Sequence, residues 1–196
     1  MSLDLPPPVL YSFRRCPYAM RARLAILASG LSVELREIVL REKAPEFLAS
    51  SPKGTVPVLV TPTGVIEESF DVMLWALERS DPQGWLEMPE AGYDWIARCD
   101  GPFKTALDHT KYAVRYPDLD PEQERGRAAE FLADLNLQMA SSDWLLAQNA
   151  PWQIWQLCLL CGNLPTVTAA GLMRSPGQTC SAGWPDFWRR LVLPRS

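Results

Sequence analysis

The stretch RRCPYA at residues 14–19 places a cysteine between two segments of different hydrophobic period. The preceding run VLYSF at 9–13 is short and rich in β-branched and aromatic residues, which is typical of a buried strand. From Pro17 onward the sequence changes to a helical period, which Gly30 is expected to end. The residues that set this period are Met20, Leu24, Leu27 and Ala28, with Arg21 and Arg23 on other faces.

Cys16 is therefore expected at the N-terminus of a helix. There the unpaired backbone N–H groups and the positive end of the helix dipole favour a thiolate over a thiol. Pro17 is tolerated beside it, because the first-turn N–H has no acceptor in any case. Arg14 and Arg15 add positive potential, so the pattern indicates a nucleophilic cysteine. The Cys-Pro pair alone leaves open the alternative of a buried structural cysteine.

The remaining residues up to position 80 predict further short strands and helices, in the order β-α-β-α-β-β-α. Ser69 is the expected N-cap of the last helix. Pro57 is expected at a strand start or a sheet edge, because proline cannot donate to a ladder. This element order is a thioredoxin-like pattern. The predicted strands are 33–39, 58–61 and 65–67, and the predicted helices are 46–49 and one that residues 68–71 open.

Residues 9–79 resemble the N-terminal domain of a cytosolic glutathione S-transferase. The resemblance is to the cysteine-bearing kind, similar to the omega class and to glutaredoxin. Three motifs carry it in this order and spacing: CPYA at 16–19, PKGTVPVL at 52–59 and EES at 67–69. The resemblance implies an α/β thioredoxin-like domain followed by an all-α helical domain, with glutathione as the cosubstrate.

The resemblance implies that Cys16 bonds or activates the glutathione sulfur. Ala19 stands where a dithiol motif would have its second cysteine, so a one-cysteine cycle of thiol transfer or disulfide reduction is expected. The second substrate would be a small electrophile or a disulfide. The alternative function is that of a non-catalytic binding or interaction protein on the same scaffold, because a fold does not determine a function.

The resemblance also implies the residues that hold glutathione. The main chain of Val56, ahead of a cis Pro57, would bond to the tripeptide backbone. Ser69 and Glu68 would hold the γ-glutamyl end, since a helix N-terminus suits a carboxylate and a side-chain carboxylate accepts from an ammonium group. Lys43 would meet the glycine carboxylate. The alternative interpretation gives these residues no ligand. Ser69 is then an ordinary helix cap and Pro57 an edge proline. Lys43 and Glu68 are then solvated charges.

The chain is expected to contain two domains and a tail of different composition. Helical periods at 93–116 and 121–139 indicate long helices of the second domain. Cys99 is expected in its core, and His109 either touches an electrophilic substrate or packs at the surface. The predicted parts are a glutathione-binding domain at 1–80, a linker at 81–90, a partial all-α domain at 91–148 and an aberrant tail at 149–196.

The tail departs from the transferase pattern and is interpreted as an out-of-frame translation. Residues 151–196 hold four of the eight tryptophans and three of the five cysteines, but only one acidic residue and no lysine. Codons shifted by one base across 150–156 permit the reading S-L-A-D-M-A, which resembles the start of the core helix of glutathione transferases. The alternative is a divergent tail with packing of its own. The pair Cys158 and Cys161 has no second pair at zinc spacing, so no metal is expected.

Composition limits the partners and the compartment. A net charge of −4 and the absence of a basic run argue against a nucleic-acid binder. No apolar stretch reaches the length of about 18 residues that a membrane span needs, and the start lacks signal-peptide features, so a cytoplasmic location is expected. The resemblance implies a homodimer. Apolar faces at 91–139 would favour aggregation instead if the tail left them uncovered.

Overall fold

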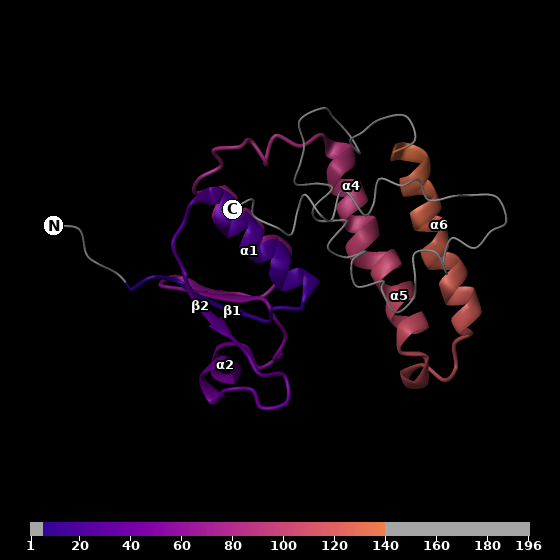
Figure 1. The fold of residues 1–196 in the computed structure, drawn as a ribbon, viewed down its shortest axis with the longest axis horizontal. Coiled ribbons are helices and arrows are strands. Elements are labelled where there is room, and N and C mark those ends of the chain that lie inside the picture. The colour runs from indigo at the N-terminus through magenta and orange to yellow at the C-terminus, as the bar shows by residue number, and fades with distance from the viewer. Residues whose placement is uncertain (1–5, 140–196) are drawn as a thin grey trace, which may run out of the picture. The chain divides into compact units, whose positions relative to one another are not determined.

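The computed structural model describes residues 6–139, which divide between Ala97 and Arg98 into two compact units (Figure 1). The hypothesis of an out-of-frame tail at 149–196 concerns residues outside the described part, as does the expected last part of the helical domain.

The first unit is built on a four-stranded mixed sheet with the strand order β2-β1-β3-β4. Strand β1 is parallel to β2 and antiparallel to β3, and β3 is antiparallel to β4. The elements follow the order predicted from the sequence, and the arrangement is thioredoxin-like. Their bounds are β1 Val9–Ser12, α1 Pro17–Ser29, β2 Glu34–Glu37, α2 Pro45–Ser50, β3 Val58–Thr61, β4 Gly64–Ile66, α3 Ser69–Leu77 and α4 Glu90–Arg98.

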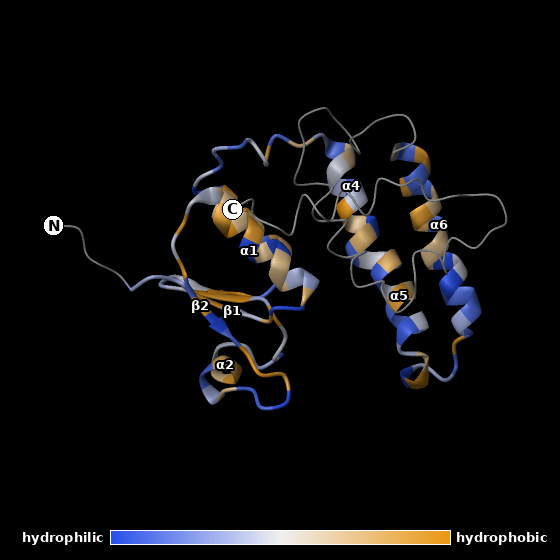
Figure 2. Cartoon of the chain, in the orientation of Figure 1, coloured by the Kyte–Doolittle hydropathy of each residue, from blue (hydrophilic) through white to orange (hydrophobic). Residues whose placement is uncertain are grey.

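Both faces of the sheet are covered, with α1 on one face and α2 on the other (Figure 1). Successive strand residues point to opposite faces, so Leu10 packs with α1 and α3 while Tyr11 packs with α2. The Tyr11 ring lies 5.1 Å from that of Phe47, centroid to centroid. The edge strand β2 is exposed along its whole length and carries charged residues, so it stands out as hydrophilic beside β1 in Figure 2. Charges on an edge strand discourage further strand pairing.

Helix α1 is confirmed, but the large apolar residues that set its period are not its buried face. Leu27 is 76% exposed, whereas Ala22 and Ala25 are fully buried. Small side chains allow α1 to approach the sheet and α3 closely. Arg21, which the sequence places on another face, is only 3% exposed. Because both sides of this helix carry apolar residues, hydrophobicity alone does not distinguish them.

The segment expected as a linker packs onto the first unit. The Asp81 carboxylate accepts hydrogen bonds from the backbone N–H groups of Trp85, at 2.8 Å, and Leu86, at 2.7 Å. The side chains of Trp85 and Met88 are buried, and they join an apolar cluster with residues of α1 and α3 and with Ile96 of α4. This connection is therefore an ordered part of the first unit's core.

The second unit contains a helical hairpin. Its elements are a π-helical turn η1 at Cys99–Phe103, α5 at Lys104–Lys111, a 3-10 turn η2 at Ala113–Arg115 and α6 at Pro121–Met139. The rings of Phe103 and Phe131 stack at 4.6 Å, centroid to centroid, and Cys99 is 1% exposed, as expected for a core residue. The single helix predicted over 93–116 is wrong in detail. Pro102 lacks an N–H and its ring clashes with a regular turn, and the wider π turn accommodates it.

Candidate functional site

The strand directions bring the three motifs to one end of the sheet. Strands β1 and β3 are antiparallel, so the end of β1 and the start of β3 lie side by side. Strands β3 and β4 are also antiparallel, so the end of β4 and the start of α3 lie at this same end. Three motifs that are far apart in sequence therefore lie at the same end of the sheet. They are the motifs at 16–19, 52–59 and 67–69.

Cys16 is the N-cap residue of α1, as predicted. Its backbone is extended, with φ −81° and ψ 118°, and its side chain makes no capping bond. Pro17 is the first helical residue, and the Cys16 carbonyl accepts the first helical hydrogen bond from Met20 at 2.9 Å. The Cys16 Sγ donates instead to the backbone carbonyl of Val56 at 3.6 Å. The thiol thus lies half-buried against the second motif.

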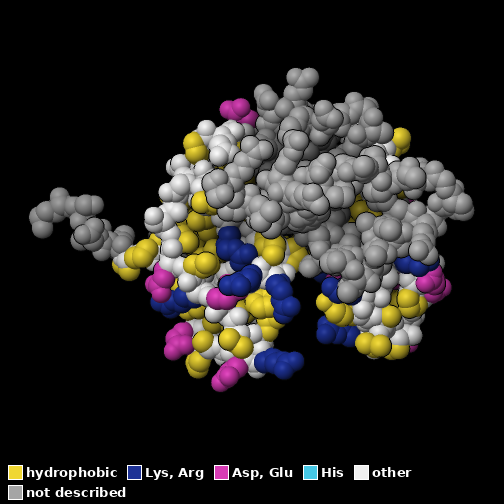
Figure 3. Space-filling model, in the orientation of Figure 1, with side chains coloured by type: hydrophobic (Ala, Val, Ile, Leu, Met, Phe, Trp, Pro, Cys, Tyr) yellow, Lys and Arg dark blue, Asp and Glu magenta, His cyan; other side chains and the backbone are white. Residues whose placement is uncertain are grey.

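The loop that carries Cys16 is held by arginine. Arg23 of α1 donates from its guanidinium to the Ser12 hydroxyl and, at 3.2 Å, to the Arg14 carbonyl. The Arg14 backbone N–H in turn donates to the Glu37 carboxylate on β2. Lys and Arg side chains gather over α1 and the sheet on the face seen in Figure 3. The thiol loop is therefore held by hydrogen bonds to α1 and β2.

Lys43 lies against the turn of the second motif. Gly54 ends this turn with a positive φ of 63°, and its N–H donates to the Ser51 carbonyl at 2.9 Å. A Cβ at Gly54 would lie 3.2 Å from the Lys43 Nζ, so the ammonium group sits directly on the turn that leads to Val56. The peptide between Val56 and Pro57 is cis, as the resemblance implied.

At the third motif, Glu68 forms an ion pair with Lys53. The hydrogen bond to the Glu68 carboxylate raises the pKa of Lys53. Neighbouring Glu67 accepts a hydrogen bond from the buried Ser51 hydroxyl. Lys53 was not predicted from the sequence, although its place in the PKGTVPVL motif was a signal that it lies near this site.

The prediction that Ser69 is the N-cap of α3 is wrong. The N-cap position is Glu68, without a side-chain capping bond, and Ser69 is the first helical residue. The Ser69 hydroxyl is buried and accepts a hydrogen bond from Arg21 Nε at 3.0 Å. The hydrogen-bond partner of this hydroxyl is therefore a residue of α1 and not a backbone group of α3.

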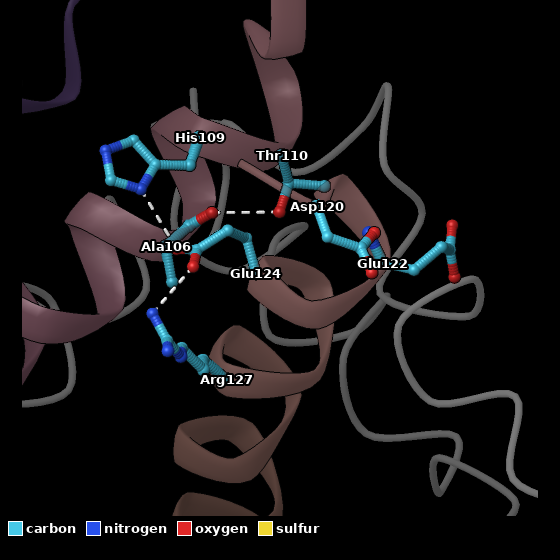
Figure 4. Close-up of polar contacts among 7 residues, drawn as sticks. All are labelled: Ala106, His109, Thr110, Asp120, Glu122, Glu124 and Arg127. Carbon is cyan, nitrogen blue, oxygen red and sulfur yellow. Dashed lines mark hydrogen bonds and ion pairs between the residues drawn. The ribbon is translucent and has the colours of Figure 1, made fainter. Parts of the chain in front are cut away.

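His109 has a packing role in the second unit. Its Nδ1 lies 2.9 Å from Oε2 of Glu124, which is 2% exposed, and Arg127 donates to Oε1 of the same carboxylate at 2.7 Å (Figure 4). The imidazole also packs on Tyr116, with ring centroids 4.4 Å apart. These contacts join α5 to α6, and they account for His109 without a substrate.

Within residues 6–139 no group of three or more His, Cys, Asp and Glu side chains is arranged to hold a metal ion. None of the helices in this range is both long and apolar enough to cross a membrane. The pair Cys158 and Cys161 lies outside the described residues.

Comparison with known sequences gives a consistent result for residues 10–84, which match the family model "Glutathione S-transferase, N-terminal domain". A probable glutathione transferase of Aplysia californica is 45% identical over 78 residues, covering 40% of this chain and 84% of that sequence. A zeta-class glutathione S-transferase of Euphorbia esula is 36% identical over 36% of this chain and 32% of that protein. Mouse glutathione S-transferase omega-2 is 42% identical over 26% of this chain and 20% of that protein. The chain thus matches a third or less of the length of the last two relatives.

Solved structures show the same fold at low sequence identity. Glutathione transferase Omega 3C of Trametes versicolor superposes with a TM-score of 0.66 at 18% identity, covering 82% of this chain and 74% of that one. A delta-class enzyme of Nilaparvata lugens gives 0.69 at 16%, with coverage of 82% and 80%. A family member from Pseudomonas fluorescens, solved with two glutathione bound, gives 0.67 at 18%, with coverage of 87% and 82%.

Proposed function

Because this chain belongs to the glutathione S-transferase family, we propose that it binds glutathione and uses Cys16 as the nucleophile of a thiol-transfer reaction. The observation that carries the proposal is the position of Cys16 at the N-terminus of α1, with its Sγ 3.6 Å from the Val56 carbonyl. A cysteine at a helix N-terminus, in electropositive surroundings, is the usual setting of a reactive thiol.

The seating of glutathione follows from the arrangement around the sheet end. The main chain of Val56, beside the cis Pro57, bonds to the cysteinyl part of the tripeptide and directs its sulfur toward Cys16. The hydroxyl of Ser69 and the N-terminus of α3 hold the α-carboxylate of the γ-glutamyl group. Glu68 accepts from the α-ammonium, and Lys43 meets the glycine carboxylate.

The reaction needs one enzyme cysteine, a glutathione mixed disulfide as the substrate and one molecule of free glutathione. The Cys16 thiolate attacks the glutathionyl sulfur of a mixed disulfide, so that the bond between Cys16 and glutathione forms and the other thiol leaves and takes up a proton. The thiolate of a free glutathione then attacks the glutathionyl sulfur on Cys16. Cys16 leaves as the thiolate, and the product is glutathione disulfide. Overall, the non-glutathione thiol of the substrate is released in reduced form, and one free glutathione thiol is oxidised in its place.

The test is reduction of a small glutathione mixed disulfide by the full chain, measured by the formation of glutathione disulfide. Cys16→Ser should abolish turnover and leave retention on immobilised glutathione intact. Cys99→Ala removes a buried cysteine of the second unit and is the matched control, which should retain turnover. Turnover that survives in Cys16→Ser would contradict the proposal. Retention of the wild type without turnover would favour the non-catalytic binding protein.

Family membership also supports a cytoplasmic homodimer. Sedimentation at several protein concentrations should show a dimer at constant stoichiometry. A sedimentation coefficient that rises steadily with concentration would indicate aggregation instead.

A further inference from the structure

Arg21 is a buried arginine that donates a hydrogen bond to a residue of another helix. Its side chain is 3% exposed, and its Nε donates to Ser69 Oγ at 3.0 Å, from α1 to the first residue of α3. The guanidinium carbon lies 5.1 Å from the centroid of the Tyr18 ring, which lies one helical turn earlier on α1. Arginine is rarely buried unless it is paired, and here the aromatic ring and the hydrogen bond both restrict the guanidinium plane.

This hydrogen bond determines what the Ser69 hydroxyl has left to offer. A serine hydroxyl has one proton to donate and two lone pairs that accept. The cationic Arg21 donates to one lone pair of the Ser69 hydroxyl oxygen. The hydroxyl proton of Ser69 then points away from Arg21. The hydroxyl does not cap α3, whose N-cap is Glu68 without a side-chain bond. It therefore remains available as a donor at a helix terminus whose first-turn N–H groups also lack helical acceptors.

We propose that Arg21 is a positioning residue, which orients the Ser69 hydroxyl so that it donates to the α-carboxylate of the γ-glutamyl group of glutathione. The inference rests on the proposed function and deepens it. Arg21 does not touch the ligand in this arrangement. It fixes the rotamer of Ser69, and the oriented hydroxyl then favours an anion at the N-terminus of α3.

The decisive measurement compares two ligands that differ only in the carboxylate. Glutathione and its analogue γ-aminobutyryl-cysteinyl-glycine, which lacks the α-carboxylate, are titrated by calorimetry into the full chain. The wild type should bind glutathione about tenfold more tightly than the analogue, the size of one charge-assisted hydrogen bond. The ratio of the two dissociation constants is taken within each protein preparation, so a variant with a reduced folded fraction still gives a valid ratio.

Arg21→Gln should reduce this ratio toward one and leave binding of the analogue unchanged. Arg21→Lys, which retains a buried positive charge but cannot reproduce the Nε contact, should have the same effect and serves if the neutral variant does not fold. Ser69→Ala should also reduce the ratio, and adding Arg21→Gln to it should change nothing further. Arg79→Gln alters an exposed arginine two residues after the end of α3 and is the control, which should keep the wild-type ratio.

Three results would overturn the inference. If the Arg21 variants weakened the binding of both ligands equally, Arg21 would have a merely structural role. A collapse of the ratio in Ser69→Ala but not in the Arg21 variants would leave the glutathione site intact and remove Arg21 from it. Failure of the wild type to bind either ligand would refute the proposed glutathione site itself, and this inference with it.

Discussion

Replacing Gly54 with alanine should destabilise the chain and separately weaken its hold on the glycine end of glutathione. Gly54 has a φ of 63°, and a Cβ there would lie 3.2 Å from Lys43 Nζ and 3.3 Å from Leu48 Cδ2. Gly30, which ends α1, has a similar φ of 71° but nothing within 4 Å of the Cβ position. The two glycines thus share a backbone conformation and differ in their neighbours.

The difference between them isolates the effect of contact. An L-residue in the left-handed region costs about 1–2 kcal/mol, and Gly30→Ala should lose only this amount. Gly54→Ala must also displace Lys43 and Leu48 by a few tenths of an ångström, an overpacking effect that adds about 1 kcal/mol. The free energy of unfolding should therefore fall by about 2–3 kcal/mol in Gly54→Ala and by about 1–2 kcal/mol in Gly30→Ala.

Urea denaturation of both variants gives these free energies, provided that the slope with denaturant stays at the wild-type value. A second assay tests Lys43 directly with glutathione and γ-glutamylcysteine, which lacks the glycine carboxylate. Gly54→Ala should weaken binding of glutathione only, and Gly30→Ala should affect neither ligand. Equal destabilisation by the two substitutions would refute the packing argument, and equal weakening of the two ligands would refute the placement of Lys43.

Phe103→Ala should lower the free energy of unfolding by about 3–5 kcal/mol, because this ring is 2% exposed and stacks on Phe131; a loss under about 1 kcal/mol on denaturation would contradict the packing of the second unit. The stabilisation of the folded state by the ion pair of Lys53 and Glu68 should be fully present just below the usual lysine pKa of 10.5. This stabilisation should be lost as the pH rises through the raised pKa of Lys53. The stability difference between wild type and Lys53→Gln, under about 1 kcal/mol because the pair is half exposed, should therefore shrink at alkaline pH; a constant difference would disprove the pairing. Sequencing of the gene should find a one-base insertion or deletion near the codons for 147–151, and an intact frame there would remove the out-of-frame hypothesis.

Local signals in the sequence were sufficient for most of the first unit. The change of hydrophobic period at Pro17 located the start of α1, and Gly30 located its end. The PKGTVPVL motif, through its resemblance, led to the cis peptide before Pro57. Each of these features depends on residues within one or two turns of chain, which is why a single sequence reveals them.

Features that depend on distant partners were not predictable in this way. Nothing near Arg21 indicates burial, because its partner Ser69 is 48 residues away on another helix. The same contact accompanies the absence of a cap at Ser69, because the Ser69 hydroxyl accepts a hydrogen bond from Arg21 of α1. The π turn differs, because Pro102 was a visible signal against a continuous helix and only the form of the interruption needed the structure.

The packing of the segment after α3 sets where this protein can be divided. A fragment that ends at Ser80 would lack Trp85 and Met88, and the apolar surface they cover on α1 and α3 would face solvent and promote self-association. A fragment that extends to Ala97 keeps these side chains and Ile96, so this apolar cluster of α1 and α3 stays covered. The practical boundary of a fragment of the first unit therefore lies after α4, two helices beyond the end of its last recognisable motif.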